Sequence, residues 1–398
     1  MSRFAIAALV MTLALSAAAA PPHVQNGDTP RDGTQTVTLQ QLWQRGQEDD
    51  DLIFGAVNAV LAGPDGNTWV MDQQLSQVFV FDADGQLLRT VSREGEGPGE
   101  TRRPESMVFF PDGSLGLAQY LNGRIVRIAP DGTPMATIIP PGSLGEGNAL
   151  ANIRRVRCRG GNLVINGVLN TPQDDGGMLR TQYLLRADAD GHPLNDYVRR
   201  STSTNLARDG WIEKNNYFPS HELWDIDADG NVIAATERNA CLITVYAPDG
   251  TVLRTFGRDL QGARRSEERK QEIRDSVTVI ADGQRIRVDV TVEDNDPVVV
   301  ELHAVPGGET WVLTSRGRQE RDGGAMATWD VYDREGVYVR RAAVVCPGDP
   351  MQDKLYFLDG GRAALVRGAV QARRNTFGGR QGDVVPPEAV HDLIMYRF

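Results

Sequence analysis

The sequence predicts an all-β fold, a six-bladed β-propeller of four-stranded antiparallel blades. Two observations predict it: turns ending in glycine recur in pairs, and short β-rich segments separate them. The two glycines of a pair lie 19 or 20 residues apart, and the first turns of the first three units lie 47 and 48 residues apart. A period of this length is typical of propellers and solenoids. The clearest pairs are Gly66 and Gly85, Gly113 and Gly132, and Gly230 and Gly250.

Residues 104–139 show the order of elements that we expect in every blade. Asp-Gly between β-rich segments is a strong hairpin signal, because glycine adopts positive φ without a steric penalty. Four such strands in about 47 residues correspond to one propeller blade. The expected strands are 106–110, 114–120, 124–128 and 135–139, with turns at Gly113, Gly123 and Gly132.

Six units of this kind follow one another, and the last is one strand short. Its third strand, 393–398, ends the chain, whereas the β-rich segment 34–43 precedes the first full unit. We therefore expect residues 34–43 to form the outer strand of the last blade and to close the ring, which removes two open sheet edges. The six units are 57–91, 104–139, 152–200, 222–256, 298–345 and 354–398.

The N-terminal 20 residues have the features of a secretory signal peptide. Arg3 precedes an apolar run from Phe4 to Leu15, and small residues follow up to Ala20. We expect residues 1–20 to be removed on export to the periplasm or the exterior, 21–33 to be disordered and 34–398 to form one propeller domain. No later stretch is apolar and long enough to cross a membrane.

The composition argues against some classes of partner. It does not decide whether two of the three cysteines form a disulfide. The net charge of −11 argues against nucleic acid or anionic lipid as a partner. Cys158, Cys241 and Cys346 are either three separate buried residues or one disulfide and one thiol, and their spacing is not that of a zinc site.

Several segments resemble NHL repeats. The loop 95–100, the turn Pro111-Asp112-Gly113, the strand 122–126 and the turn Pro130-Asp131-Gly132 form one such motif. The chain as a whole is similar to bacterial exported six-bladed propellers of the NHL-like kind. This resemblance implies the fold and a binding role for which the ligand is unknown.

Four segments interrupt the period, and long connections in a compact fold are usually functional or disordered. The segment 258–297 contains a charged helix prediction, 266–275, and an additional hairpin formed by 277–280 and 286–292. A third functional alternative is a scaffold in an envelope assembly, with 373–386 as the docking segment. The four interruptions are 171–179, 201–220, 258–297 and 368–387.

The sequence contains no convincing catalytic set or metal site. Gly-Glu-Gly-Pro at 95–98 resembles a motif of calcium-dependent lactonase propellers, but the strand expected after it begins only at Pro104. Acidic segments at 49–51, 293–296 and 225–230 contain oxygen ligands of the kind that calcium prefers, but solvated loops at the first two and a turn between strands at the third are the favoured explanations. No cofactor is therefore predicted, and a calcium ion in the central channel remains an alternative.

The most favoured function is a binding or interaction module. The bridge between the third and fourth blades carries the aromatic residues Trp211 and Tyr217, and Trp224 follows it. Together they form either a binding surface or a hydrophobic plug. His221 and His303 begin innermost strands and are either ligands or structural histidines. Arg155 either receives an anion or pairs with an acid of a neighbouring blade. The alternative function is a metal-dependent hydrolase or lyase of the lactonase-like propeller class.

Overall fold

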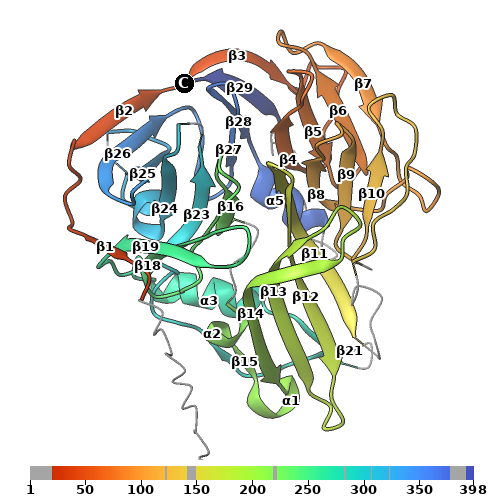
Figure 1. The fold of residues 1–398 in the computed structure, drawn as a ribbon. Coiled ribbons are helices and arrows are strands. Elements are labelled where there is room, and N and C mark those ends of the chain that lie inside the picture. The colour runs from red at the N-terminus through yellow and green to blue at the C-terminus, as the bar shows by residue number, and fades with distance from the viewer. Residues whose placement is uncertain are drawn as a thin grey trace, which may run out of the picture.

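Six mainly antiparallel sheets surround a central axis in the structure (Figure 1). The structure is a computed structural model that describes residues 20–398 except 122, 141–148, 218–221, 282–283, 306, 322 and 377–390. Each sheet is one blade, whose first strand lies nearest the axis and whose following strands lie successively further out. The predicted six-bladed propeller is therefore confirmed. The proposed signal peptide lies almost entirely outside the described residues.

The first three blades follow the predicted units closely. Blade 3 has strands about twice as long as the others, as the expected extension at 171–179 requires. In the described part of blade 2, isolated bridges of Ile125 with Ile138 and Ile128 with Pro134 take the place of a regular fourth strand. Blade 1 contains β4 (Val57–Ala62), β5 (Thr68–Asp72), β6 (Gln77–Phe81) and β7 (Leu87–Val91). Blade 2 contains β8 (Pro104–Phe109), β9 (Leu115–Gln119) and β10 (Ile125–Ile128). Blade 3 contains β11 (Leu150–Arg159), β12 (Asn162–Pro172), β13 (Met178–Ala187) and β14 (Pro193–Thr204).

The last three blades complete the ring. Blade 4 contains β16 (Trp224–Ile226), β17 (Val232–Ala234), β18 (Cys241–Tyr246) and β19 (Val252–Arg258). Blade 5 contains β23 (Val299–Ala304), β24 (Thr310–Thr314), β25 (Ala327–Tyr332) and β26 (Tyr338–Val345). Blade 6 contains β27 (Lys354–Leu358), β28 (Arg362–Val366), β29 (Leu393–Arg397) and, from the N-terminal region, β3 (Gln40–Arg45).

The N-terminal region closes the ring, as predicted, but with a shifted strand. β3 pairs antiparallel with β29, so that Gln44 lies opposite Ile394. The first half of the expected strand 34–43 instead forms β2 (Thr34–Thr38), which runs parallel to β26 at the outer edge of blade 5. The pairing changes because the outer edge of blade 5 also offers unpaired backbone groups that an extended segment satisfies.

The prediction that residues 21–33 are disordered is wrong for part of that segment. β1 (His23–Asn26) runs parallel to β19 at the outer edge of blade 4. Asn26 fixes this strand, because its side-chain amide donates to the carbonyl oxygens of Gly257 and Gly336. The N-terminal region therefore runs along three consecutive blades before the first complete blade begins (Figure 1).

Hydrophobic side chains fill the spaces between neighbouring blades. Between blades 5 and 6, for example, Trp311 and Trp329 pack with Leu365 and Ile394. Such contacts fix the blades to one another because a flat sheet buries its two faces only against its neighbours. The three cysteines form no disulfide: Cys241 is buried, and Cys158 and Cys346 are half-buried, which supports the alternative of three separate residues.

The two ends of the ring differ. In an antiparallel blade, the hairpins after the first and third strands lie at one end, which we call the turn face. The hairpins after the second strands and the connections between blades lie at the other end, which we call the insertion face. In the described chain, each turn-face hairpin has five residues or fewer, whereas the long connections all lie on the insertion face.

Short helices and strands form within these long connections. The predicted helix 266–275 is confirmed as α3 (Glu267–Ser276), with Ser266 accepting a hydrogen bond from the backbone N–H of Arg269. The expected hairpin is shorter and consists of β20 (Val279–Ala281) and β21 (Gln284–Ile286), because β22 (Val290–Thr291) pairs with β15 (Trp211–Ile212) instead. The remaining helices are α1 (Leu206–Asp209), α2 (Glu213–Asn216), α4 (Ser315–Gln319) and α5 (Ala369–Thr376).

Candidate functional site

The six innermost strands surround an axial channel that contains two neighbouring cavities. The turn-side cavity has a volume of about 210 Å³ and is lined by the later residues of these strands. The insertion-side cavity has a volume of about 140 Å³ and is lined by their earlier residues and by α5. Leu61, Met107, Arg157 and His303 line both cavities, so the two meet near the middle of the channel.

Polar side chains join several of the innermost strands to their neighbours. The inner edge of such a strand has no neighbouring strand, so its backbone N–H and C=O groups need other partners. The Asn58 side chain of blade 1 donates to the carbonyl oxygen of Pro104 in blade 2 (3.2 Å). The Ser106 hydroxyl of blade 2 accepts from the N–H of Val156 in blade 3 (3.0 Å). Many polar groups in the channel therefore connect blades.

Arg155 belongs to this set of connecting side chains. Its guanidinium donates to the Trp224 carbonyl oxygen (2.6 Å) and lies 3.8 Å from the Asp225 carboxylate of blade 4. Arg157 lies 3.5 Å from the same carboxylate. Of the two interpretations of Arg155, the structure supports pairing with an acid of the neighbouring blade.

Burial and neighbouring charges shift the pKa values of both Arg155 and Asp225. Burial lowers the pKa of Arg155 to about 9, and the charge of Arg157 adds to the effect, so Arg155 remains a cation at neutral pH. Burial alone would raise the pKa of Asp225, but the charges of Arg157 and Arg155 outweigh it and the pKa is lowered. The site is therefore a charged, internally compensated contact between blades 3 and 4.

His303 lies at the middle of the channel and is hydrogen-bonded. Its Nε2 is 2.8 Å from the Glu301 carboxylate, and its ring packs against Trp329 and Phe357. Lys354 lies 3.5 Å from Glu301. Burial would raise the pKa of Glu301, but Lys354 and His303 outweigh it and the pKa is lowered. These contacts favour the structural interpretation of His303, whereas His221 lies outside the described residues.

The predicted aromatic surface is not formed as expected. Trp224 is completely buried between blades 3 and 4, next to Val164 and Leu184, so the prediction that it contacts a ligand is wrong. Tyr217 is half-buried and packs against the core of blades 4 and 5. Trp211 is half-buried in β15. The structure therefore favours the plug interpretation of this segment.

The acidic segments considered as calcium sites form internal contacts. Asp50 lies 2.7 Å from the Arg45 guanidinium and accepts from the N–H groups of Gly46 and Leu52. Asp294 pairs with Lys270 (2.9 Å). Within the described ranges, one group has a geometry that could hold a metal: Asp188, Asp190 and His192 in a turn of blade 3. That group is largely exposed. It lies in the turn between β13 and β14, whereas the channel is lined by the innermost strands of the blades.

Sequence reasoning missed the role of α5. This helix lies near the centre of the ring in Figure 1, and its Ala369, Val370 and Arg373 line the insertion-side cavity. Arg373 pairs with the buried carboxylate of Glu105, which also accepts from the Gln73 amide (2.6 Å). The interruption of the repeat at 368–387 predicted an insertion in the last blade. No sequence pattern within this segment predicts that part of it lines the channel.

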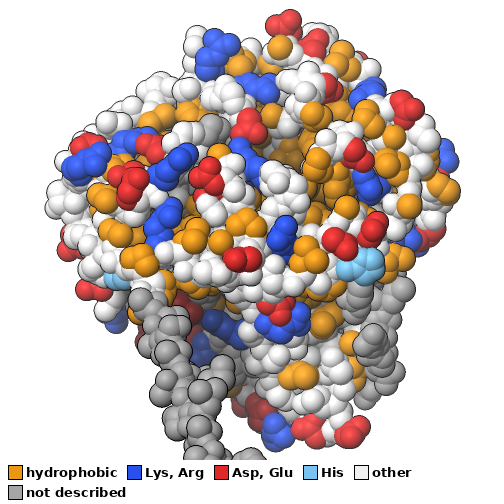
Figure 2. All heavy atoms as spheres, in the orientation of Figure 1, with side chains coloured by type: hydrophobic (Ala, Val, Ile, Leu, Met, Phe, Trp, Pro, Cys, Tyr) orange, Lys and Arg blue, Asp and Glu red, His pale blue; other side chains and the backbone are white. Residues whose placement is uncertain are grey.

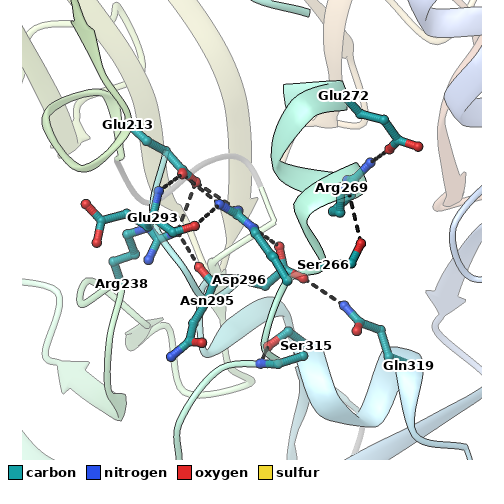
Figure 3. Close-up of polar contacts among 12 residues, drawn as sticks. Glu213, Arg238, Ser266, Arg269, Glu272, Glu293, Asn295, Asp296, Ser315 and Gln319 are labelled. Carbon is teal, nitrogen blue, oxygen red and sulfur yellow. Dashed lines mark hydrogen bonds and ion pairs between the residues drawn. The ribbon is translucent and has the colours of Figure 1, made fainter. Parts of the chain in front are cut away.

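A buried ion network fixes the other insertions against blades 4 and 5 (Figure 3). Glu213 of α2 accepts from Arg265 (2.7 and 2.9 Å), from Arg238 (2.9 Å) and from the N–H of Glu293 (2.9 Å). Arg265 also pairs with Asp296 (2.7 Å). Burial would raise the pKa of Glu213, but its hydrogen bonds outweigh it and the pKa is lowered. The insertions 205–217 and 259–297 are thus joined into one surface.

Comparisons with known proteins agree on the architecture. A family model described as a 6-bladed beta-propeller matches residues 48–108, which include blade 1 and the beginning of blade 2. No curated protein has a sequence significantly similar to this chain. In the described residues, no helix is long and apolar enough to cross a membrane.

Solved structures similar to this chain have low identity. A Bacteroides fragilis protein to which export is provisionally assigned has a TM-score of 0.45 and 11% identity, over 95% of this chain and 99% of that chain. Virginiamycin B lyase from Staphylococcus aureus has a TM-score of 0.42 and 9% identity, over 89% and 98%. A luciferin-regenerating enzyme has a TM-score of 0.43 and 9% identity, over 86% and 91%. These similarities carry no argument about activity or ligand.

Proposed function

We propose that this chain is an exported, NHL-like bacterial propeller that binds a ligand or partner on its insertion face. The observation that carries the proposal is the difference between the two faces: in the described chain, the connections longer than six residues all belong to the insertion face. Binding residues are disproportionately found on loops that a rigid scaffold positions. A turn face made only of tight hairpins offers fewer such residues.

Ion pairs and hydrogen bonds also hold the insertions of this face in place. The Glu213 network joins two insertions, and α5 is attached through Val370, whose N–H donates to Gln352 (2.9 Å), and through Arg103, which donates to the Thr376 carbonyl oxygen (3.2 Å). A rigid surface loses little conformational entropy on binding. The N-terminal features of residues 1–20 support export to the periplasm or the exterior.

The channel contacts favour this function over the metal-dependent hydrolase or lyase. The carboxylates of Glu105, Asp225 and Glu301 each lie against arginine or lysine side chains. A calcium site needs several carboxylate and carbonyl oxygens directed at one point, and these three oxygen groups are directed at cations of the protein itself.

Hydrogen–deuterium exchange of the mature protein, with and without a soluble envelope extract of its host, tests the proposal. We expect slower exchange in peptides from 205–217, 259–281 and 367–376 when the extract is present. Peptides from the turns at 247–251 and 333–337 serve as internal controls and should not change. Slower exchange confined to these turns, or no change at either face, would contradict the proposal. Dialysis of the extract then separates a small ligand from a macromolecular partner.

A further inference from the structure

A bulge in β11 directs two consecutive arginines at the insertion-side cavity. In a regular strand, neighbouring side chains point to opposite faces. The register of β11 against β12 shifts between Ile153 and Arg155, and both Arg154 and Arg155 line the cavity. Bulges of this kind commonly redirect a side chain next to a functional site.

Arg154 differs from the other cations of this cavity in its partners. Arg155 and Arg157 lie near Asp225, and Arg373 pairs with Glu105. In the part of the chain that the structure describes, no carboxylate pairs with Arg154. Its guanidinium lies 3.4 Å from the Tyr120 hydroxyl and 5.2 Å from the centre of the Tyr120 ring, and both are neutral groups.

Arg180 of β13 is a second cation near Arg154, although it is not one of the residues that line the cavity. Its guanidinium donates to the side-chain oxygens of Asn216 (2.9 Å) and Asn170 (3.4 Å), and no ion pair forms with it among the described residues. Burial lowers the pKa of Arg180, and the charge of Arg154 lowers it further. The two guanidinium groups therefore repel each other.

This arrangement is unusual for a chain with a net charge of −11. Acidic and basic side chains are interspersed over the face of the ring seen in Figure 2, as expected where each charge has a nearby counter-charge. Five cationic side chains line the insertion-side cavity, and four of them lie against carboxylates: Arg155 and Arg157 against Asp225, Lys354 against Glu222 and Glu301, and Arg373 against Glu105. Among the described residues, Arg154 is the lining cation without such a carboxylate. A bound anion would relieve the repulsion between Arg154 and Arg180.

Apolar side chains line another part of the cavity. Val57 and Val60 of β4, Met107 of β8 and Val370 of α5 line it. A cavity lined by both cationic and apolar side chains suits a small amphipathic anion, because the apolar part of the ligand leaves water while its charge stays paired. The volume of about 140 Å³ limits the ligand to a short chain or a single ring.

We propose that the insertion-side cavity binds a small carboxylate with a short apolar tail. The carboxylate lies against the Arg154 guanidinium, which suits two parallel hydrogen bonds to a planar anion. The charge of Arg180 adds to the attraction, and the tail lies against β4 and α5. This inference rests on the proposed binding role of the insertion face and specifies the chemical class of its ligand.

Calorimetric titration of the purified mature protein with sodium hexanoate tests this inference. Hexanoate should bind, whereas hexylammonium, which has the same tail and the opposite charge, should not. Inorganic phosphate should bind at least tenfold more weakly than hexanoate because it lacks the tail. Binding of hexylammonium as tight as that of hexanoate, or of phosphate as tight as that of hexanoate, would overturn the proposed ligand class.

Variants locate the binding site. Arg154→Gln should weaken hexanoate binding about tenfold or more, the effect of losing a hydrogen bond to a charged group, and Arg154→Lys should restore part of the affinity. Arg180→Gln should weaken binding about threefold or more. Arg334→Gln is the matched control, because it removes the same charge from an exposed turn-face side chain. Equal affinity of Arg154→Gln and the control, with unchanged melting of both, would contradict the site.

The proposed ligand class and the proposed binding face can be refuted independently of each other. If hexanoate does not bind but the envelope extract still protects the insertion face, the ligand class is wrong and the binding face stands. If hexanoate binds in the cavity but the extract protects only the turn face, the carboxylate site stands and the proposed binding face is wrong.

Discussion

Two turn glycines of this chain, Gly336 and Gly85, each meet two requirements at once. Gly336 has a φ of +88°, and a Cβ there would lie 2.7 Å from the Phe256 side chain in the preceding blade. Gly85 has a φ of +81°, and a Cβ there would lie 2.7 Å from Trp43. In these two blades, the turn after the third strand thus packs against the outer strand of the blade before it. At these two positions glycine therefore serves both the turn and the contact between blades.

Gly336→Ala should destabilise the protein more than Gly66→Ala. Both residues have positive φ, which costs a non-glycine residue about 1–2 kcal/mol. Only at Gly336 does the new methyl group meet a neighbouring side chain, and this overpacking adds about 1–3 kcal/mol. Chemical denaturation of the two variants measures the difference, and equal losses of unfolding free energy would contradict the packing role.

His391 joins the first and last blades by hydrogen bonds that require its neutral imidazole. Its Nε2 accepts from the Val57 N–H (3.0 Å), and its Nδ1–H donates to the Arg367 carbonyl oxygen (2.9 Å). Burial lowers the pKa of His391 below its ordinary value of 6.5, against the opposing effect of that carbonyl and nearby acids. The folded state therefore resists protonation more than the unfolded state does.

Stability should consequently fall as the pH decreases through 6.5 towards the lower pKa of folded His391. In this window the unfolded chain binds a proton that the folded chain does not, so unfolding is favoured. Well above pH 6.5 both states are neutral and this contribution is constant. Denaturation midpoints between pH 7.5 and 5 should show the decrease, and His391→Gln should reduce the slope. An unchanged slope in the variant would exclude His391 as its source.

At the level of elements, the Glu213 network determines how the insertions are held. Glu213→Gln should loosen 205–217 and 259–297, because it removes one negative charge from two buried arginines, a loss on the order of 3 kcal/mol. Limited proteolysis should then cut these segments faster while the blades stay intact. Glu272→Gln, which removes an exposed charge paired with Arg269, is the control. Equal cleavage of both variants would show that Glu213 does not hold the insertions.

Elements defined by local signals were predictable, whereas those defined by distant partners were not. The Asp-Gly hairpins and α3 follow from turn glycines and from Ser266, all within a few residues. β1 and β2 pair parallel with blades 4 and 5, and no turn joins these strands to mark the pairing. Pairing of Arg155 with a neighbouring acid was one of two alternatives, but the lack of an acidic partner for Arg154 depends on the whole fold.

At the scale of the whole molecule, the two faces and the channel exist only if the ring is closed. Closure joins the two ends of the chain: β3 pairs with β29 on one side, and β28 pairs with β29 on the other. The first and last blades then enclose Trp43, Phe81 and Met395 in one core. The insertion-side cavity also depends on closure, because β4 and α5 come from the two blades that meet there.

Hydrogen exchange of the individual β29 amides tests this closure most directly. In an antiparallel sheet, successive residues of an inner strand form hydrogen bonds to alternate neighbours. We therefore expect all amides of Leu393–Arg397 to be protected in the mature protein, whichever neighbour they face. A chain shortened to begin after Arg45 should lose protection at alternate positions. Rapid exchange at alternate β29 amides of the full mature chain would show that β3 is not paired there and that the ring is open.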